Sequence, residues 1–299
     1  MTRTKDREPC LAPAACEGMD RPERACLIIN AASGSNTPEA CDALRGGLTA
    51  HGIAIARTIA VPDDALPAPA ELDAAGIALV AIYTGDGTLR SALTRLEGWG
   101  GAVLVLPGGT TNLLSKAIHG DRPLEEILAE VPRMRRRRRN CLRSEAGTAV
   151  IEIVAGPGAK WSDVREGLRE GDVAAVASTV VEAAQASAGG STVVLSKPAL
   201  GKPEGYSGIR LTPLGDGIEV EGYGAETIAD YLAQGMALLR RDFRSGPHDE
   251  LGLHARLHCA SVDGSPIELM LDGERDCGGA ELTISLAELD VDLLTASDA

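Results

Sequence analysis

The stretch IALVAIYTGDGTLRSALTRL (residues 77–96) decides the fold of the N-terminal part of the chain. Its first seven residues are apolar without alternation, which is typical of a strand buried on both faces of a parallel sheet. A glycine-rich loop, TGDGT (84–88), follows, and the pattern becomes helical from Leu89. The stretch therefore predicts a strand–loop–helix unit whose loop lies at the carboxyl end of a buried strand.

Two further units of the same kind flank this stretch. CLIIN (26–30) precedes TPEACDALRGGLTAHG (37–52), in which Thr37 is the expected N-cap and Pro38 the first helical residue. AVLVLP (102–107) leads through GGTTN (108–112) into the helical stretch LLSKAIHG (113–120). Three such units predict an α/β domain with a parallel sheet and with its loops gathered at the carboxyl ends of the strands.

The pattern changes after residue 143. Short strand-like segments follow, separated by Gly, Pro, Asp or Ser: AVIEIVAG, STVVLS, SGIRLTPL, GIEVEGY, LHARLHCASV, IELML and AELTISL. Several of them alternate polar and apolar residues, as half-exposed antiparallel strands do. Two helical stretches, at about 160–188 and 225–243, interrupt them. We expect a mostly β C-terminal domain of sandwich type. The expected organisation is a disordered tail (1–24), an α/β domain (25–130) that residues from about 286 to 299 could rejoin, and a β-rich domain (131–285).

Composition narrows the function and the compartment. The formal net charge of −14 argues against nucleic-acid binding. The seven cysteines are odd in number and form no CxxC pair, which favours unpaired thiols in a reducing cytosol. No apolar run approaches the roughly 20 residues of a membrane helix, and residues 1–25 lack the apolar centre of a secretory signal. We expect a cytoplasmic protein, and leave open whether Met19 is the native start.

Each predicted unit has a loop suited to phosphate binding: NAASGSN (30–36), TGDGT (84–88) and PGGTTN (107–112). Glycines let backbone N–H groups approach a phosphate, and the following helix N-termini add unpaired donors. Turns after strands favour the same residue types, but three such loops together favour a nucleotide site. Asp86 would repel a phosphate unless a cation lies between them. It therefore either organises Mg²⁺ or caps the helix that starts near Leu89, and the spacing leaves both open.

These loops carry a family resemblance. NAASGSN, TGDGT and LPGGTTNLLSKAIHG (106–120) resemble the NPxSG, GGDGT and PxGTxN motifs of the diacylglycerol kinase catalytic family, which includes bacterial soluble lipid kinases and sphingosine kinases. LTPLGDGIEVEGY (211–223) and IELMLDGERDCGG (267–279) are similar to two later family segments, the second being its DGE turn. The nucleotide motifs are shared with NAD kinases, whereas the DGE segment favours a lipid kinase.

The resemblance implies ATP and Mg²⁺ as cofactors, a lipid hydroxyl as the acceptor and a role in phospholipid biosynthesis. Asp272 would be the general base, with Glu274 and Asp86 in the same network. Asp272 and Glu274 are expected on one face of an extended strand, facing a cleft between the domains. Asp86 and Asp216 would bind Mg²⁺, Asp216 at a structural site. The nucleotide would be bound by Asn30, Ser33, Gly34, Thr84, Gly85, Gly87, Thr88, Gly109, Thr110 and Asn112.

Some residues depart from the family pattern. Thr84 replaces the first glycine of GGDGT, Ala31 replaces proline, and LRSALTRL (89–96) lacks the Glu and Asn that the family often has there. LDGER (271–275) also reads as an ordinary hairpin turn. A protein that binds nucleotide or lipid without turnover and an NAD kinase-like enzyme are the alternatives to a lipid kinase.

Two surface features remain. Seven arginines lie between Arg133 and Arg143. They could form a solvated edge strand between the domains, which we favour, or a peripheral contact with an anionic membrane carrying the lipid substrate. His254 and His258 have helical metal-ligand spacing, but their segment reads as a strand and Arg256 would share their face, so a metal there is not expected. Homodimer formation is left open.

Overall fold

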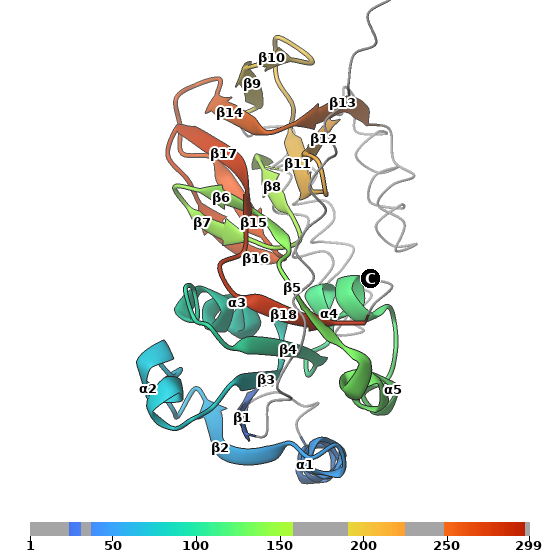
Figure 1. The fold of residues 1–299 in the computed structure, drawn as a ribbon. Helices are drawn as coiled ribbons and strands as arrows, with labels where there is room; N and C mark the ends of the chain where they lie inside the picture. The colour runs from blue at the N-terminus through green and yellow to red at the C-terminus, as the bar shows by residue number, and fades with distance from the viewer. Residues whose placement is uncertain (1–23, 31–36, 158–190, 225–247, 297–299) are drawn as a thin grey trace, which may run out of the picture.

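The computed structural model describes residues 24–30, 37–157, 191–224 and 248–296. The predicted helical stretches at 160–188 and 225–243, the tail up to residue 23, and the candidate residues Ser33 and Gly34 lie outside the described residues. The described chain forms a parallel α/β layer and a β-rich part, which lie one above the other in Figure 1.

The α/β layer is built on a six-stranded sheet. In spatial order its strands are β2 (Ala54–Val61), β1 (Arg24–Asn30), β3 (Leu79–Thr84), β4 (Ala102–Pro107), β18 (Asp292–Thr295) and β5 (Arg135–Arg137). All neighbours pair in parallel except β18 and β5. The three strands predicted from apolar runs are β1, β3 and β4, and they occupy the buried centre. The edge strand β2 was not predicted, because only one of its eight residues is buried and polar residues interrupt its apolar ones.

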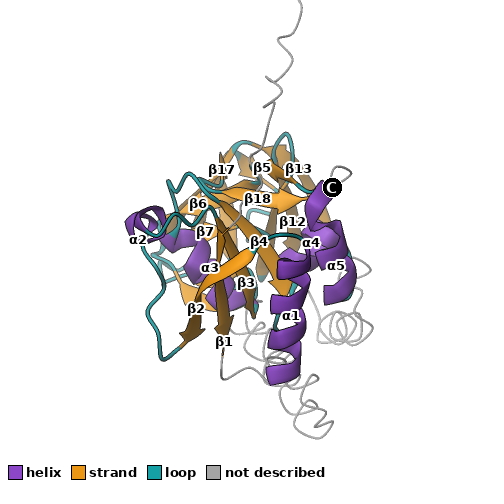
Figure 2. Ribbon diagram, turned by 60° about the horizontal axis from the view of Figure 1, so that its bottom comes forward, coloured by secondary structure: helices purple, strands orange, loops and turns teal. Residues whose placement is uncertain are grey.

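Helices cover both faces of this sheet (Figure 2). They are α1 (Pro38–Ala50), α2 (Pro69–Ala74), α3 (Asp86–Arg95), α4 (Leu113–His119) and α5 (Leu124–Glu130), followed by a short 3₁₀ turn η1 (Val131–Arg133). Leu44 and Leu48 of α1 pack on one sheet face together with Ile127 and Leu128 of α5. Apolar residues of α2 and α3 pack on the other face. Thr37 is the N-cap of α1 as predicted, because its hydroxyl accepts from the Ala40 N–H at 3.2 Å.

The β-rich part is two six-stranded sheets packed on one core, which confirms the predicted sandwich class. One sheet has the order β10 (Ala199–Leu200), β9 (Val193–Lys197), β14 (Arg256–Ser261), β17 (Glu281–Glu288), β6 (Asn140–Ser144) and β7 (Gly147–Ala149). The other has the order β13 (Asp249–His254), β12 (Ile218–Tyr223), β11 (Gly208–Pro213), β8 (Ile153–Ala155), β15 (Glu268–Leu271) and β16 (Glu274–Cys277). Alternate residues of both sheets, such as Leu211 and Ile284, fill the space between them.

Two predicted segments are divided in the structure. AVIEIVAG is not one strand, since β7 ends at Ala149 and β8 begins at Ile153. LHARLHCASV is also broken, which places His254 on β13 in one sheet and His258 on β14 in the other. The described residues contain no group of three or more His, Cys, Asp and Glu that could hold a metal.

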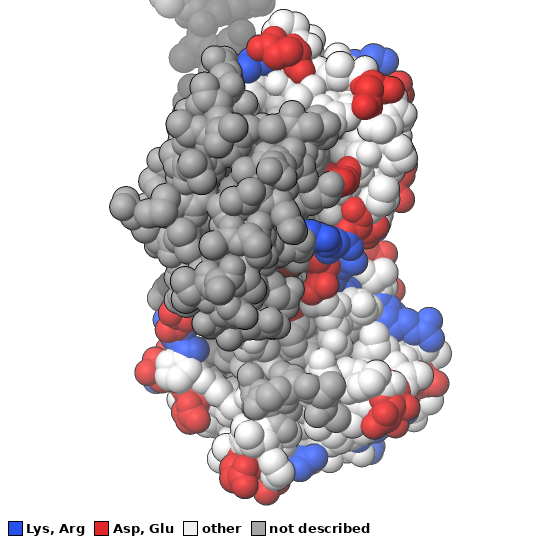
Figure 3. Space-filling view, turned by 180° about the vertical axis from the view of Figure 1, so that it is seen from behind, with Lys and Arg blue, Asp and Glu red and all other residues white. Residues whose placement is uncertain are grey.

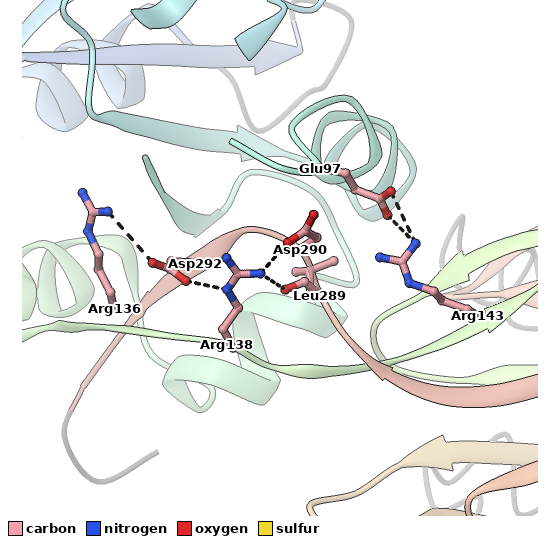
Figure 4. Close-up of polar contacts among 7 residues, drawn as sticks. All are labelled: Glu97, Arg136, Arg138, Arg143, Leu289, Asp290 and Asp292. Atoms are coloured by element: carbon pink, nitrogen blue, oxygen red, sulfur yellow. Dashed lines mark hydrogen bonds and ion pairs between the residues drawn. The ribbon is translucent and has the colours of Figure 1, made fainter. Parts of the chain in front are cut away.

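Within the described residues the chain crosses between the two parts twice, and these two crossings lie side by side. The first runs from β5 to β6 through Arg138 and Arg139, and the second runs from β17 to β18 through Leu289. The Leu289 N–H donates to the Arg139 carbonyl at 2.8 Å. Arg138 joins them further, with Nη1 2.7 Å from Asp290 and Nε 2.8 Å from Asp292 (Figure 4). Among the described helices, none is long and apolar enough to cross a membrane.

Candidate active site

The carboxyl ends of β1, β3 and β4 meet at one edge of the parallel sheet. Ile29 lies opposite Tyr83, and Thr84 lies opposite Pro107. Asn30 therefore ends its strand beside the two glycine-rich loops.

Thr84 is buried, and its hydroxyl donates to the Gly85 carbonyl at 3.1 Å. Its φ is not positive, because Asn112 and Asp272 are the non-glycine residues with positive φ among those described. Threonine is therefore compatible with the backbone at this position.

Close contact between two loops explains their glycines. A Cβ on Gly109 would lie 2.5 Å from the Gly85 Cα, and a Cβ on Gly108 would lie 2.3 Å from the Tyr83 carbonyl carbon. Both distances are impossible for a real side chain, so the loop after β4 packs directly on the loop after β3. The glycines were predicted as phosphate-approach positions. The structure gives them a second role, which is to bring the two loops together.

Asn112 closes the loop after β4 into a ring. Its Oδ1 accepts from the Gly109 N–H at 2.8 Å, and its Nδ2 donates to the Gly109 carbonyl at 2.9 Å. The residue has φ 52° and ψ 45°, the left-handed region that asparagine tolerates better than most residues. Its side-chain amide is thus committed to the loop. Asn112 holds the loop and the start of α4 in place, while Thr110 stays exposed beside it.

Asp86 links two helix N-termini. It is the first residue of α3, whose N-cap is Gly85, so of the two alternatives left open for Asp86 the helix cap is wrong. Its carboxylate instead accepts hydrogen bonds from the backbone N–H groups of Leu113 and Leu114 at the start of α4. Gly87 and Thr88 follow it in the first turn of α3, where backbone N–H groups have no acceptor within the helix. The two helices are thereby held with their N-termini toward one region.

Asp272 reaches this region from the β-rich part. It does not lie on an extended strand, as was expected, but in the two-residue turn Asp272–Gly273 between β15 and β16, with φ 51° and 89°. Two successive positive φ values are what a tight hairpin needs, and Asp-Gly is a preferred pair for it. The prediction of a same-face pair with Glu274 is therefore corrected. The hairpin reading of LDGER is confirmed, and the turn still carries the carboxylate to the site.

Three backbone N–H groups hold the Asp272 carboxylate. Val150 donates to Oδ2 at 2.8 Å, Ile151 to Oδ1 at 2.8 Å and Glu152 to Oδ1 at 3.0 Å. The Asp272 N–H returns a hydrogen bond to the Glu152 carbonyl at 3.0 Å. These interactions explain why AVIEIVAG breaks into two strands, since residues 150–152 bond to Asp272 instead of a neighbouring strand. No local pattern marks this segment as a partner of Asp272, because it lies about 120 residues away along the chain.

Glu274 and α3 join the two parts of the molecule at this point. A Cβ on Gly87 would lie 2.9 Å from Glu274 Oε1, so the Glu274 side chain lies directly on the first turn of α3. One turn further along α3, Arg90 lies 3.8 Å from Asp276 of β16. The residues predicted from the loop after β3 and from the DGE segment are thus brought together.

The acidic groups of the site influence one another. Burial raises the pKa of Asp86, the N–H groups of Leu113 and Leu114 oppose the rise, and the charges of Asp272 and Glu274 add to it. Burial also raises the pKa of Asp272, which is 6% exposed, against the effect of its three N–H donors. The raised pKa values of the two aspartates, Asp86 and Asp272, indicate a region that favours a cation or a proton.

The donors of the site fit a Mg²⁺ ion shared with a nucleotide. Mg²⁺ is usually bound by one or two carboxylates together with phosphate oxygens and water, rather than by a complete protein cage. Asp86 and Glu274 supply carboxylates of this kind.

The surroundings of Asp216 do not fit the predicted structural Mg²⁺ site. Asp216 is exposed in the β11–β12 turn, and the neighbouring carbonyls of Leu214 and Gly215 accept from Asn140. None of the described residues gathers a ligand set around it.

A cavity of about 660 Å³ lies alongside α3, beyond its first turn. It is lined by Leu66, Arg90, Ser91, Thr94, Arg95 and Glu97 and by residues 146–148 at the β6–β7 turn. Ser91 and Thr94 belong to LRSALTRL (89–96), the segment that lacks the Glu and Asn of the resembled family. The cavity is thus formed by both parts of the molecule, next to the helix that carries Asp86.

Comparison with known proteins agrees with this geometry. The model of the diacylglycerol kinase catalytic domain matches residues 24–142 of the 299-residue chain. The predicted family resemblance is confirmed. The matched residues include the three predicted loop motifs, Asp86 and Asn112. Comparison of the sequence with curated proteins finds no match.

Solved structures show the same fold. A diacylglycerol kinase from Bacillus anthracis strain Sterne superposes with a TM-score of 0.63 at 13% identity, covering 94% of this chain and 99% of that one. A second structure from the same strain has a TM-score of 0.65 at 14% identity, covering 95% of this chain and 98% of that one. The likeness therefore extends over the β-rich part as well as the matched diacylglycerol kinase catalytic domain.

Proposed function

We propose that the protein is an ATP-dependent lipid kinase that transfers the γ-phosphoryl group to a lipid hydroxyl, diacylglycerol or a related lipid. One observation carries the proposal: the Asp272 hairpin of the β-rich part lies against the first turn of α3, beside Asp86 and Gly87. The diacylglycerol kinase match and the fold support the lipid acceptor. The cavity beside α3 supports a place for the nucleoside.

Asp272 is suited to accept the proton of the acceptor hydroxyl. Its Oδ1 already accepts two hydrogen bonds, whereas its Oδ2 accepts one from Val150 and keeps a lone pair. The raised pKa makes this carboxylate a better base than an exposed aspartate. In the proposed step the acceptor oxygen forms a bond to the γ-phosphorus, the bond from that phosphorus to the oxygen of ADP breaks, and the hydroxyl proton moves to Asp272.

The other site residues bind and orient the phosphates. The N–H groups of the first turns of α3 and α4 and the exposed hydroxyl of Thr110 supply donors to them. Mg²⁺, when bound, supplies positive charge between the phosphate oxygens and the carboxylates of Asp86 and Glu274. Without that charge these carboxylates would repel the nucleotide. Burial, and after it the charges of Asp272 and Glu274, raises the pKa of Asp86.

We also propose that the enzyme is cytoplasmic and meets its lipid substrate peripherally, through the arginines between Arg133 and Arg143. Arg135 and Arg137 are exposed on β5, at the edge of the sheet. Arg136, Arg138 and Arg143 instead pair with acidic residues (Figure 4). On the face shown in Figure 3, basic and acidic side chains are interspersed where the chain is described. A contact with an anionic membrane would therefore rest on Arg135 and Arg137, which form no ion pair with an acidic residue among the described residues.

The test is transfer of label from γ-labelled ATP to lipid. Purified protein, Mg²⁺ and a bacterial lipid extract are incubated, and label in the organic phase is measured beside Asp272→Asn and the exposed control Asp121→Asn. We expect label with the wild type and the control, and a loss of at least about 100-fold with Asp272→Asn. Chromatography of the product identifies the acceptor. Absence of organic-phase label from protein that binds ATP would refute the lipid assignment and leave a soluble acceptor or binding without turnover.

A further inference from the structure

A buried ion-pair network lies on the outer face of the sheet that carries the Asp272 hairpin. Arg210 of β11 lies directly opposite Glu221 of β12, and its Nη1 is 3.1 Å from Glu221 Oε2. The Nε of Arg210 is 2.8 Å from Glu152 Oε2. The residues before and after Arg210 in β11 fill the sandwich core, so the side chain of Arg210 points to the other face of the sheet. Glu152 and Glu221 are 8% and 7% exposed, so one arginine binds two buried carboxylates.

Glu152 connects this network to the proposed general base. β8 pairs with β15, and Glu152 immediately precedes β8 while Asp272 immediately follows β15. The Glu152 N–H donates to Asp272 Oδ1 at 3.0 Å, and the Asp272 N–H donates to the Glu152 carbonyl at 3.0 Å. The residue whose side chain binds Arg210 therefore binds Asp272 with its backbone.

The segment 150–152 is held differently at its two ends. Val150 is buried in the apolar core of the α/β layer, and Ile151 packs against the same core. Glu152 is held from the β-rich part, by its ion pair with Arg210. Two N–H groups of the segment donate to Asp272 Oδ1 and one donates to Oδ2, which fixes the rotation of the carboxylate. The direction of the Oδ2 lone pair that would accept a proton depends on this rotation.

We propose that Arg210 is a positioning residue: through its ion pair with Glu152 it holds the segment 150–152 in the geometry that orients the Asp272 carboxylate. This inference rests on the proposed kinase function, in which Asp272 accepts the proton of the acceptor hydroxyl. Arginine suits the role, since charge-assisted hydrogen bonds from its rigid guanidinium fix the geometry of the carboxylates that it binds. A misplacement of about 1 Å can lower a rate about 100-fold, so the position of this segment is expected to affect turnover.

Two matched variants separate this role from a contribution to stability. Glu152→Ala and Glu221→Ala each remove one carboxylate from Arg210 and leave it paired with the other, so neither variant leaves the buried arginine without a partner. They differ in that Glu152 also binds Asp272. Arg210→Gln removes the shared partner, and Arg256→Gln, at an exposed position of β14, is the neutral control.

Turnover is measured with γ-labelled ATP and the lipid extract, and hydrogen exchange of the backbone N–H groups of residues 150–152 is measured by nuclear magnetic resonance. We expect kcat to fall about 10- to 100-fold in Glu152→Ala and Arg210→Gln, with the KM for ATP within about twofold of wild type. Exchange of these N–H groups should become faster in both variants. Glu221→Ala should lose far less turnover, and Arg256→Gln should match wild type. In an Asp272→Asn background, Glu152→Ala should cause no further loss, since it acts through Asp272.

Several outcomes would overturn the inference. Equal losses of turnover in Glu152→Ala and Glu221→Ala would show a structural role, as would a further loss from Glu152→Ala in the Asp272→Asn background. Turnover or hydrogen exchange of Glu152→Ala close to that of wild type would exclude the positioning role, and this variant decides the question if Arg210→Gln does not fold. Wild-type protein without turnover would refute the proposed function, and this inference with it. The first failures appear only in the variants and the last in wild type, so they are distinguishable.

Discussion

Replacing Asn112 tests how the loop after β4 is held. Asn112→Ala removes the hydrogen bonds of 2.8 and 2.9 Å to Gly109 and leaves alanine at φ 52°. Each hydrogen bond contributes about 0.5–1.5 kcal/mol, and a left-handed conformation costs alanine roughly 1–2 kcal/mol. We expect a loss of about 2–5 kcal/mol in the free energy of unfolding. Asn112→Gly removes the same hydrogen bonds without the conformational strain, so it should lose about 1–2 kcal/mol less.

Urea unfolding of the full chain, followed by circular dichroism, measures both variants against wild type. Calorimetric binding of ATP is measured in parallel, because the ring positions the start of α4 and with it the N–H groups that bind Asp86. Equal stability of the alanine and glycine variants would refute the argument from φ. If both variants lie within about 0.5 kcal/mol of wild type, the ring itself does not stabilise the loop.

Three further predictions concern the same region. Asp86→Asn should abolish turnover, yet it should unfold at a higher urea concentration than wild type at pH 7. The pKa of Asp86 is raised in the folded protein, so ionisation of Asp86 lowers the free energy of unfolding of the wild type as pH rises. The difference in stability between the variant and wild type should therefore vanish below about pH 4, which urea unfolding at several pH values measures. Gly108→Ala should destabilise the fold by at least about 1–3 kcal/mol, measured by thermal unfolding, since its Cβ would meet the Tyr83 backbone at 2.3 Å. Arg138→Gln should cost no more than about 1 kcal/mol at low salt and less in 1 M salt, since its ion pairs are partly exposed, and salt-independent destabilisation would contradict this.

Local patterns in the sequence predicted the centre of the parallel sheet. β1, β3 and β4 are continuous apolar runs, and the cap of α1 is a Thr-Pro pair whose geometry is fixed within four residues. For β18 and β5 the sequence suggested only that residues from about 286 to 299 could rejoin the α/β domain and that the arginine run could form an edge strand, with no indication of which strands they pair with. Their places depend on pairing between Leu293 and both Val103 and Arg137, contacts that span most of the chain.

The candidate site was predictable in its residues but not in its geometry. Loop motifs identified Asp86, Asn112 and Asp272, yet the sequence did not show that Asp86 bonds to the start of α4. Nor did it show that Asn112 turns its amide back to Gly109. Both depend on the packing of one loop on another, which a pattern along the chain does not contain.

The Asp272–Gly273 turn shows that a sequence motif can indicate a backbone turn without indicating a catalytic role. A tight hairpin favours Asp-Gly whether or not the carboxylate reacts, so the letters DGE alone do not distinguish a turn from a general base. The distinction lies in the carboxylate, which Val150 and its two neighbours hold beside α3 rather than leave in solvent. Asn-Gly forms the same turn as readily as Asp-Gly. Asp272→Asn therefore keeps the hairpin while it removes the proton acceptor, and a loss of turnover in that variant reports on the carboxylate itself.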